Sequence, residues 1–326
     1  MPPYPSSFQL ADLAAARAAL RRRLQLVQGV PPASKTFVIV NGKGGVGKSS
    51  TAAALAVALA RLGLKVLLGE LDEQGNNAED LGFTGGPLDD GGRAQAAAIL
   101  DGKPLVPTGE ARANLFVLPG GPALEEVVEE LYCQRRAAAH ADSHEEQAAW
   151  TAMYAAAIDA VADDFDVIIL DVAPGCEPLQ LQALVAGHRV LIPTKSDPSS
   201  RKGLRTVARR FAKAVALNPI LRLLGVVVFA TNSSATRVQE DIKSQLSVDL
   251  RGAAPVFEQT IRHVEAAAVA CRKLGKVPQE LRLAKTLEPA IRKSMSALAG
   301  DYQSLAIEVM QAKAEMDQQQ REELAA

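Results

Sequence analysis

The residues best suited to chemistry stand in one glycine-rich run, residues 42–50, which follows an apolar β-branched stretch over 36–40. The run fits the pattern G-x-x-x-x-G-K-[ST], which forms a phosphate-binding loop between a buried strand and a helix. Its glycines let backbone N–H groups turn inward around a triphosphate, and the helix N-terminus adds positive charge. In this pattern Lys48 reaches the β- and γ-phosphates, and the Ser49 hydroxyl binds Mg²⁺. The predicted nucleotide-binding residues are Gly42, Lys43, Gly44, Gly45, Val46, Gly47, Lys48, Ser49 and Ser50.

Two further strand ends carry carboxylates. The apolar run 65–69 is followed by Glu-Leu-Asp-Glu-Gln-Gly-Asn over 70–76, and the run 165–170 ends at Asp171. In doubly wound sheets the ligand lies at the carboxyl ends of the strands, so these groups are expected near the phosphates. Asp72 could hold the attacking water in line with the γ-phosphate or support Mg²⁺ through water, although a solvated acidic turn has the same pattern. Asp171 completes a Walker-B pattern and is predicted to be an outer-shell Mg²⁺ partner.

Together these motifs resemble the ParA/MinD family of deviant Walker-A ATPases, most closely its ParA DNA-partition branch, whose second motif reads Asp-x-Asp-Pro-Gln-Gly-Asn. The likeness covers residues 33–312 and includes Lys43, a second lysine that an ordinary phosphate loop does not need. It implies a homodimer closed across ATP, in which Lys43 reaches the partner's nucleotide, and slow ATP hydrolysis stimulated by a partner protein. A lysine supplied in this way neutralises phosphate charge only once the dimer has closed. The predicted catalytic residues are thus Lys43, Lys48 and Asp72, with ATP and Mg²⁺ as cofactors.

Two positions depart from the family pattern, because Glu70 stands for the first Asp of the second motif and Glu73 for its Pro. Asp72 keeps the family's water-facing position, so hydrolysis is still expected.

The run Thr-Lys-Ser-Asp over 194–197 imitates the T-K-x-D guanine-recognition motif of GTPases. It follows the first strand after the Walker-B strand, earlier than in related GTPases, and we interpret it as coincidence. The base pocket is predicted after the strand 223–230, with Asn232 reading adenine.

Strand-like and helical segments alternate along the chain. Strands are predicted over 36–40, 65–69, 115–118, 166–171, 189–193 and 223–230, and helices over 49–62, 123–137, 145–162, 177–187, 201–217, 235–246 and 289–314. Near-continuous Val, Ile and Leu in strands between helices indicate a parallel sheet covered on both faces. The predicted fold class is therefore α/β, a doubly wound, mostly parallel sheet of the P-loop NTPase type, in one domain over 33–312.

The two ends of the chain are predicted to lie outside this domain. Residues 1–32 form a short N-terminal extension with one helix over 8–28. That helix either packs on the main domain or serves as a partner-binding arm. Residues 313–326 are polar and are predicted to be a fraying helix end.

The composition excludes several classes of protein. Because the net charge is −1, any affinity for nucleic acid must come from a local patch. The three cysteines form no pair of suitable spacing, which indicates a reducing cytosol and argues against an iron–sulfur carrier. No apolar run reaches membrane-spanning length, and the polar ending lacks the basic amphipathic helix of membrane-bound MinD-type regulators. We therefore predict a cytoplasmic protein with no membrane partner, and the resemblance to partition ATPases implies that it is nucleoid-associated.

One segment is strongly basic. This segment spans 189–213. Within it, basic residues recur every four positions and form a stripe along one helix face: Arg201, Arg205, Arg209 and Lys213. Such a stripe suits binding to the phosphate backbone of DNA without sequence readout, although a solvated helix face has the same pattern. In the resembled family, non-specific DNA binding depends on arginines near the regions matching Arg237 and Arg262. Glu265 stands where some members carry Arg, which shifts the prediction partly to the stripe.

The leading hypothesis is an ATPase that partitions plasmids or chromosomes. ATP closes a dimer, the dimer binds DNA non-specifically, and a ParB-like partner triggers hydrolysis and release. The alternative is a positioning ATPase that uses the same cycle for a non-DNA cargo, such as a protein cluster or polar assembly. The sequence separates these poorly, because the cargo adaptor is a different chain.

Overall fold

The computed structural model describes residues 10–25, 34–141, 143–195, 197–231, 236–250 and 254–325. The strands are β1 (Thr36–Ile39), β2 (Val66–Leu71), β3 (Gly109–Arg112), β4 (Leu115–Leu118), β5 (Val167–Val172), β6 (Arg189–Thr194), β7 (Arg222–Thr231) and β8 (Ile261–Arg262). The helices are α1 (Leu10–Gln25), α2 (Lys48–Arg61), α3 (Asn76–Leu81), α4 (Arg93–Leu100), α5 (Ala123–Ala138), α6 (His144–Ala149), α7 (Met153–Val161), α8 (Glu177–Ala186), α9 (Pro198–Leu217), α10 (Thr236–Leu250), α11 (Glu265–Leu274), α12 (Pro278–Leu281) and α13 (Pro289–Ala325). Short 3-10 turns at Trp150–Ala152 and Ala162–Asp164 flank α7.

The described strands form one sheet in the order β3-β4-β2-β5-β1-β6-β7-β8. Every neighbouring pair is parallel except β3 and β4, which are antiparallel. The predicted mostly parallel, doubly wound sheet is thereby confirmed. Because β1 lies between β5 and β6, and β2 lies beside β5, the loops that follow these four strands meet at one edge of the sheet.

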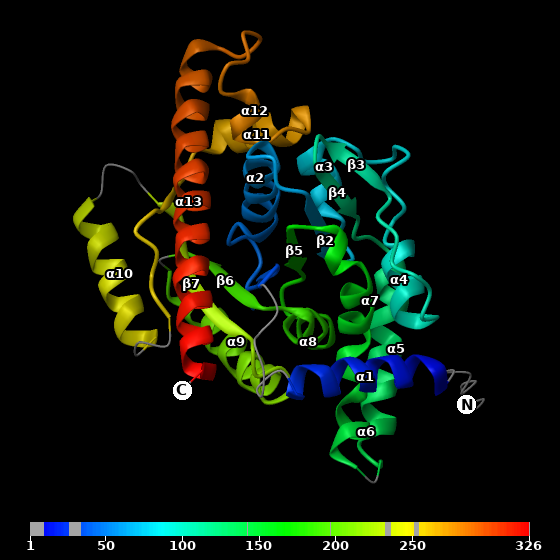
Figure 1. The fold of residues 1–326 in the computed structure, drawn as a ribbon. Helices are drawn as coiled ribbons and strands as arrows, with labels where there is room; N and C mark the ends of the chain where they lie inside the picture. The colour runs from blue at the N-terminus through cyan, green and yellow to red at the C-terminus, as the bar shows by residue number, and fades with distance from the viewer. Residues whose placement is uncertain are drawn as a thin grey trace.

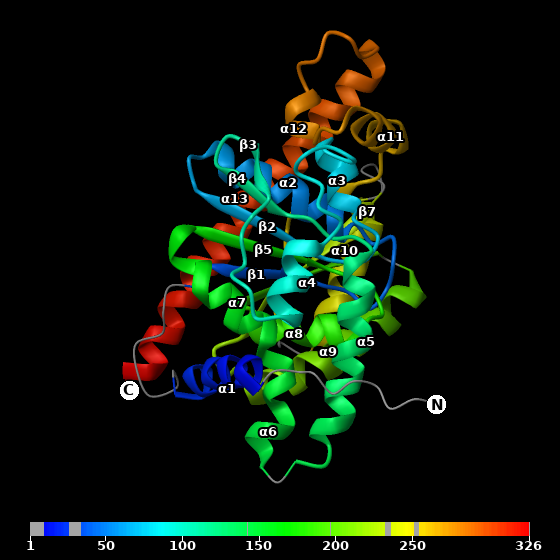
Figure 2. The ribbon, with the colours of Figure 1, turned by 90° about the vertical axis from the view of Figure 1, so that its right-hand side faces the viewer.

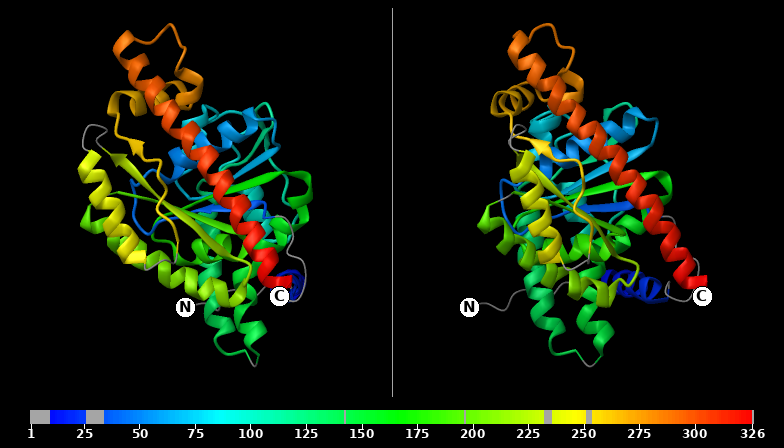
Figure 3. Two further views of the ribbon diagram at one scale, coloured as in Figure 1. Left: turned by 60° about the vertical axis from the view of Figure 1, so that its left-hand side comes forward. Right: turned by 90° about the vertical axis from the view of Figure 1, so that its left-hand side faces the viewer.

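Helices cover both faces of the sheet (Figures 1 and 2). Alternate residues of each strand point to opposite faces, so Phe37 and Ile39 pack toward α2, α11, α12 and α13, while Val38 and Val40 pack toward α1, α4, α5, α7, α8 and α9. Figure 3 shows α13 crossing the first of these faces. None of the helices in the described parts of the chain is both long enough and apolar enough to span a membrane.

Some elements are not predicted by the sequence pattern. The edge strands β3 and β8 are short, with four and two residues, and β3 has no apolar run. The helices α3, α4, α11 and α12 are also additional to the prediction, and the predicted helix 145–162 is divided into α6 and α7 by a 3-10 turn. These pieces are too short for a hydrophobic period to show, and packing against the main domain decides their conformation.

The N-terminal helix α1 packs on the domain at α7 and α8. Its own residues Ala16, Ala19 and Leu20 are buried in the hydrophobic core. The Arg23 side chain, itself buried, donates from Nε to the Val185 carbonyl at 2.6 Å and from Nη2 to the Asp159 carboxylate at 2.8 Å. These contacts fix both the register and the direction of the helix.

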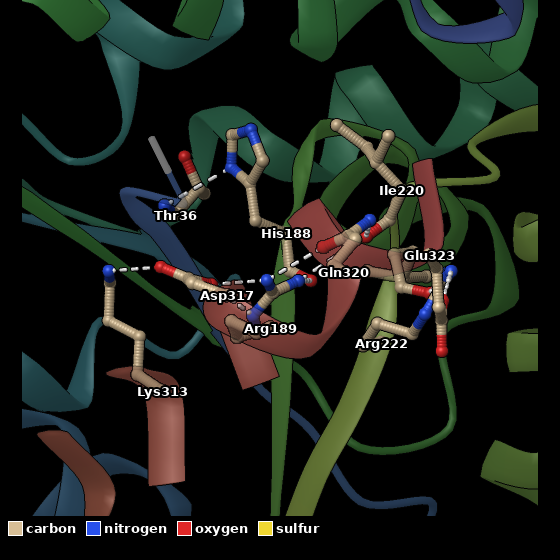
Figure 4. Close-up of polar contacts among 10 residues, drawn as sticks. Thr36, His188, Arg189, Ile220, Arg222, Lys313, Asp317, Gln320 and Glu323 are labelled. Carbon is tan, nitrogen blue, oxygen red and sulfur yellow. Dashed lines mark hydrogen bonds and ion pairs between the residues drawn. The ribbon is translucent and has the colours of Figure 1, made fainter. Parts of the chain in front are cut away.

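The C-terminal segment differs from the expected fraying end, because α13 continues as a helix to Ala325 and is held on the domain around Asp317 and Gln320 (Figure 4). The guanidinium of Arg189, 1% exposed, forms an ion pair with Asp317 and donates to Gln320 Oε1 at 2.8 Å. Lys313 holds the other Asp317 oxygen at 2.6 Å. A buried charge needs such partners, so this arginine at the start of β6 anchors the polar end of the helix.

Candidate nucleotide-binding site

The phosphate loop is shaped by glycine conformation and by its neighbours. Gly45 and Gly47 have left-handed φ angles of 69° and 86°. A Cβ on Gly47 would also lie 2.3 Å from the Phe229 ring, so only glycine fits there. At the start of the loop, the buried Asn41 side chain donates to a β6 carbonyl at 2.7 Å and accepts the Lys43 N–H at 2.9 Å. The protein itself therefore fixes how the loop leaves the sheet.

Buried acidic and basic groups converge behind the loop. Burial lowers the pKa of Lys48, against the opposing charges of Asp171 and Asp72. Burial raises the pKa of Asp171 to about 6, despite a hydrogen bond from Ser49 and the charge of Lys48. One Asp171 oxygen accepts from Asn77 Nδ2 at 3.1 Å. The other, Oδ1, is buried and has no hydrogen-bond partner among the described residues.

This arrangement fits a magnesium ion. A buried carboxylate oxygen without a partner is costly, and a cation would satisfy it. The Ser49 hydroxyl and the carboxylates of Asp171 and Asp72 are oxygen donors, and Mg²⁺ in phosphate sites uses one or two carboxylates together with substrate phosphates. Within the described residues no group of three His, Cys, Asp or Glu side chains could hold a metal alone. Phosphate oxygens and water would therefore complete the coordination.

Two buried acidic residues, Glu70 in β2 and Asp72 directly after it, connect the end of this strand to its surroundings through hydrogen bonds. Asp72 is 6% exposed, its Oδ1 accepts the Gln74 N–H at 3.0 Å, and its carbonyl accepts the Gly121 N–H at 2.9 Å. Glu70 is 1% exposed and accepts the N–H of Asn77, at the start of α3, at 3.1 Å. Burial, and next the charge of Asp171, raises the pKa of Glu70 well above its usual range. Glu70 is one methylene longer than the Asp of the family motif. Its carboxyl group accepts a backbone hydrogen bond at the N-terminal end of α3 and so holds this end of the helix.

The surplus loop lysine has a partner in its own chain. Lys43 Nζ lies 2.7 Å from Asp197 Oδ1, and both side chains are about one-third exposed, 31% and 38%. The sequence patterns did not predict this contact, because Asp197 belongs to the run 194–197, which we interpreted as a coincidental guanine motif. The pairing follows from the adjacency of β1 and β6, which the spacing of residues along the chain does not reveal.

A cavity of about 390 Å³ opens beside the phosphate loop, within the size range of ligand pockets. Its wall includes Gly47 and Ser50, Phe229 and Ala230 near the end of β7, and residues 261–264, which comprise β8 and the two residues after it. The cavity lies where the base pocket was predicted, next to the end of the strand 223–230. Asn232, the predicted base reader, lies outside the described residues. Phe229 and the 261–264 turn were not predicted, since no spacing pattern marks them.

The candidate DNA-binding residues are in different surroundings. Arg205 and Arg209 are exposed on α9, and Arg237 is exposed on α10. Lys213 forms an exposed ion pair with Glu177 at 2.8 Å. The side chain of Arg201 lies outside the described residues.

Arg262 forms an ion pair within its own chain. Asp301, which is 7% exposed, receives two hydrogen bonds from the Arg262 guanidinium, at 2.6 and 2.7 Å. The arginine also forms part of the cavity wall beside the phosphate loop. Its charge is therefore already paired within the chain, and a role of Arg262 in DNA binding stays a prediction.

Comparison with known proteins decides the family. The sequence model of a family described as an AAA domain matches residues 34–223, more than half of the chain. The chromosome partitioning protein ParA of Myxococcus xanthus is 31% identical over 257 residues, covering 76% of this chain and 82% of that protein. The chain belongs to the ParA/MinD family of P-loop ATPases. The family resemblance in the sequence is confirmed, and with it ATPase activity.

Two further similar proteins extend the comparison. The chromosome-partitioning ATPase Soj of Thermus thermophilus is 32% identical over 215 residues, covering 65% of this chain and 75% of that protein. A crystal structure of cobyrinic acid a,c-diamide synthase from Mycobacterium smegmatis, with bound ATP analog and magnesium, has a TM-score of 0.58 and 25% identity. It covers 78% of this chain and 96% of that protein. The family therefore includes proteins solved with the two cofactors predicted here.

Proposed function

We propose that this ParA/MinD-family ATPase is a partition ATPase. ATP and Mg²⁺ close a homodimer, the dimer binds DNA without sequence readout, and a ParB-like adaptor stimulates hydrolysis and release. The observation that carries the proposal is the similarity to relatives named for chromosome partitioning, at 32% identity over 215 residues and 31% identity over 257 residues. The alternative, positioning of a non-DNA cargo by the same cycle, is an outcome of the experiment below.

In this proposal each site residue has one role. Lys48 and the loop N–H groups hold the phosphates, Ser49 and Asp171 support Mg²⁺, and Asp72 orients the attacking water. Lys43 acts in the partner's site, so its ion pair with Asp197 must break as the dimer closes. An exposed ion pair contributes little to stability, about 1 kcal/mol or less, so phosphate charge can displace Asp197.

Lys43→Gln should leave ATP binding to the monomer intact and abolish the ATP-dependent dimer, because the amide stays polar but is one atom shorter and carries no charge. Light scattering with a slowly hydrolysed ATP analogue measures the dimer, and a fluorescent ATP analogue measures binding. Lys103→Gln is a suitable control, since Lys103 is exposed and paired only locally with Asp101 at 2.9 Å in the structure. A normal dimer with Lys43→Gln would remove the trans role.

The proposed DNA surface is the exposed face of α9. Arg205 and Arg209 stand one turn apart on it, and the exposed residues between and after them, Ala208 and Ala212, are small. Small side chains leave room for a phosphate backbone to approach both guanidinium groups. Non-specific binding of this kind depends on charge and falls steeply with salt.

The test is DNA binding by the ATP-bound protein across a range of salt concentrations. Arg205→Glu with Arg209→Glu should weaken binding about 10-fold or more at low salt and reduce the salt slope by about 2. The control pair, Arg282→Glu with Lys285→Glu, reverses two exposed charges near the C-terminus and changes the net charge equally. Equal losses for both pairs would contradict a specific role for α9. A dimer that closes on ATP yet binds no DNA would favour the non-DNA cargo.

A further inference from the structure

Arg210 on α9 points inward, in contrast to its exposed neighbour Arg209. Its Nη1 donates to the side-chain oxygen of Gln180 on α8. Its Nη2 donates to the backbone carbonyl of Gly175 at 3.0 Å. The two arms of the guanidinium thus connect α9 to a second helix and to the loop that follows the Walker-B strand β5.

Gln180 continues this connection to the phosphate loop. The side chain is fully buried, and its Nε2 donates to the Ala173 carbonyl at 2.8 Å and to the Asn41 carbonyl at 3.4 Å. Ala173 follows β5 directly, and Asn41 begins the phosphate loop. The amide orientation is set by its surroundings, because the oxygen must accept from Arg210 while the nitrogen donates to two carbonyls.

The loop 173–176 needs such support. Gly175 has a left-handed φ of 82°, and no atom lies within 4 Å of the position that its Cβ would take. One residue earlier, the Pro174 ring lies 3.8 Å from the position of a Cβ built on Gly44 of the phosphate loop. The loop therefore lies beside the phosphate loop on one side and is held by the Arg210 hydrogen bond on the other.

We propose that Arg210 and Gln180 form a clamp that positions the loop 173–176 against the phosphate loop for ATP hydrolysis. Asp171 and the backbone after it must keep a fixed place relative to Lys48 and Ser49, because displacement of about 1 Å at a reacting centre can cost on the order of 100-fold in rate. Arg210 is thus a positioning residue that acts through the loop without touching the phosphates. The clamp thus connects α9 to the loop after β5, in addition to the direct packing of Gly203 and Thr206 of α9 beside Gly42 of the phosphate loop.

The property to test is the ability of the Arg210 guanidinium to donate to Gln180 and to Gly175 at the same time. Lysine keeps the charge and much of the aliphatic stem but cannot bond Gln180 and Gly175 together in the same way. Arg210→Lys should lower kcat about 10-fold, while the Kd for a fluorescent ATP analogue stays within about twofold. Arg135→Lys is the matched control, since Arg135 contacts the start of α8 through an ion pair with Glu177 at 3.3 Å and is 48% exposed. That control should retain its kcat.

The assays contain no DNA, so the outcome does not depend on the proposed partition function. Rates are divided by the fraction of protein that binds nucleotide stoichiometrically, which removes losses from misfolding. Gln180→Met tests the other half of the clamp, and the double variant with Arg210→Lys should be no slower than the slower single variant. Multiplied losses in the double variant, or an Arg210→Lys rate equal to that of the control, would overturn the proposal.

Discussion

Asp72→Asn is expected to slow ATP hydrolysis by about 100-fold or more while ATP remains bound, because positioned acid–base groups contribute roughly 10²–10⁴-fold. Asparagine has nearly the same shape, and its side-chain oxygen can still accept the Gln74 N–H, which lies 3.0 Å from Asp72 Oδ1. It has no negative charge with which to orient and polarise water. The variant should therefore accumulate as an ATP-bound dimer. Single-turnover hydrolysis and light scattering measure the two effects.

Glu73→Gln provides the control for the loss of one acid in the same loop. Glu73 is partly exposed, and burial, followed by the charge of Asp72, raises the pKa of its carboxyl group. If only the summed negative charge of the loop mattered, both variants would slow hydrolysis equally. Unchanged turnover with Asp72→Asn would assign the water-orienting role to another group.

Asp317→Ala should lower the free energy of unfolding by about 3–5 kcal/mol, because it leaves the buried guanidinium of Arg189 without its carboxylate. The position lies at the end of α13, where the amino-acid composition alone indicates a dispensable tail. Urea unfolding followed by circular dichroism measures the change. Glu323→Ala is the control, since Glu323 is exposed and lies 3.8 Å from Arg222 (Figure 4), and its loss should cost about 1 kcal/mol or less.

The double variant Arg189→Met with Asp317→Leu separates the buried charge from the packing of the helix. Replacing both charges by apolar groups of similar size removes the unpaired charge and should recover most of the stability. A double variant as unstable as Asp317→Ala would show that the contribution comes from helix packing instead of the ion pair.

Local patterns were sufficient for the six inner strands of the described sheet, and the roles of the phosphate-loop residues stay predictions. The phosphate loop and the Walker-B strand are continuous in sequence, so residue type and order specify both their conformation and their chemistry. The central strands are apolar on both faces, and such runs are recognised without knowledge of their neighbours.

Contacts between segments that lie far apart in the sequence could not be predicted in this way. Lys43 meets Asp197 because β6 lies beside β1, and Arg210 reaches Gly175 because α9 packs on α8. The residues concerned are 154 and 35 positions apart, and no periodic pattern encodes such pairs. The basic stripe shows the same difficulty, since a four-residue repeat does not reveal that Lys213 is already bound to Glu177.

The edges of the sheet bear on how copies of this protein can meet. At one edge, β3 carries Glu110 and Arg112 and has a register irregularity between them, and Arg112 is held by Glu280 of α12 at 2.6 Å. At the other edge, β8 has only two residues. Charged, irregular or very short edge strands are poor templates for strand addition from another chain. Copies of this protein can therefore be close to one another at high concentration with little risk of edge-to-edge β-aggregation through the described sheet.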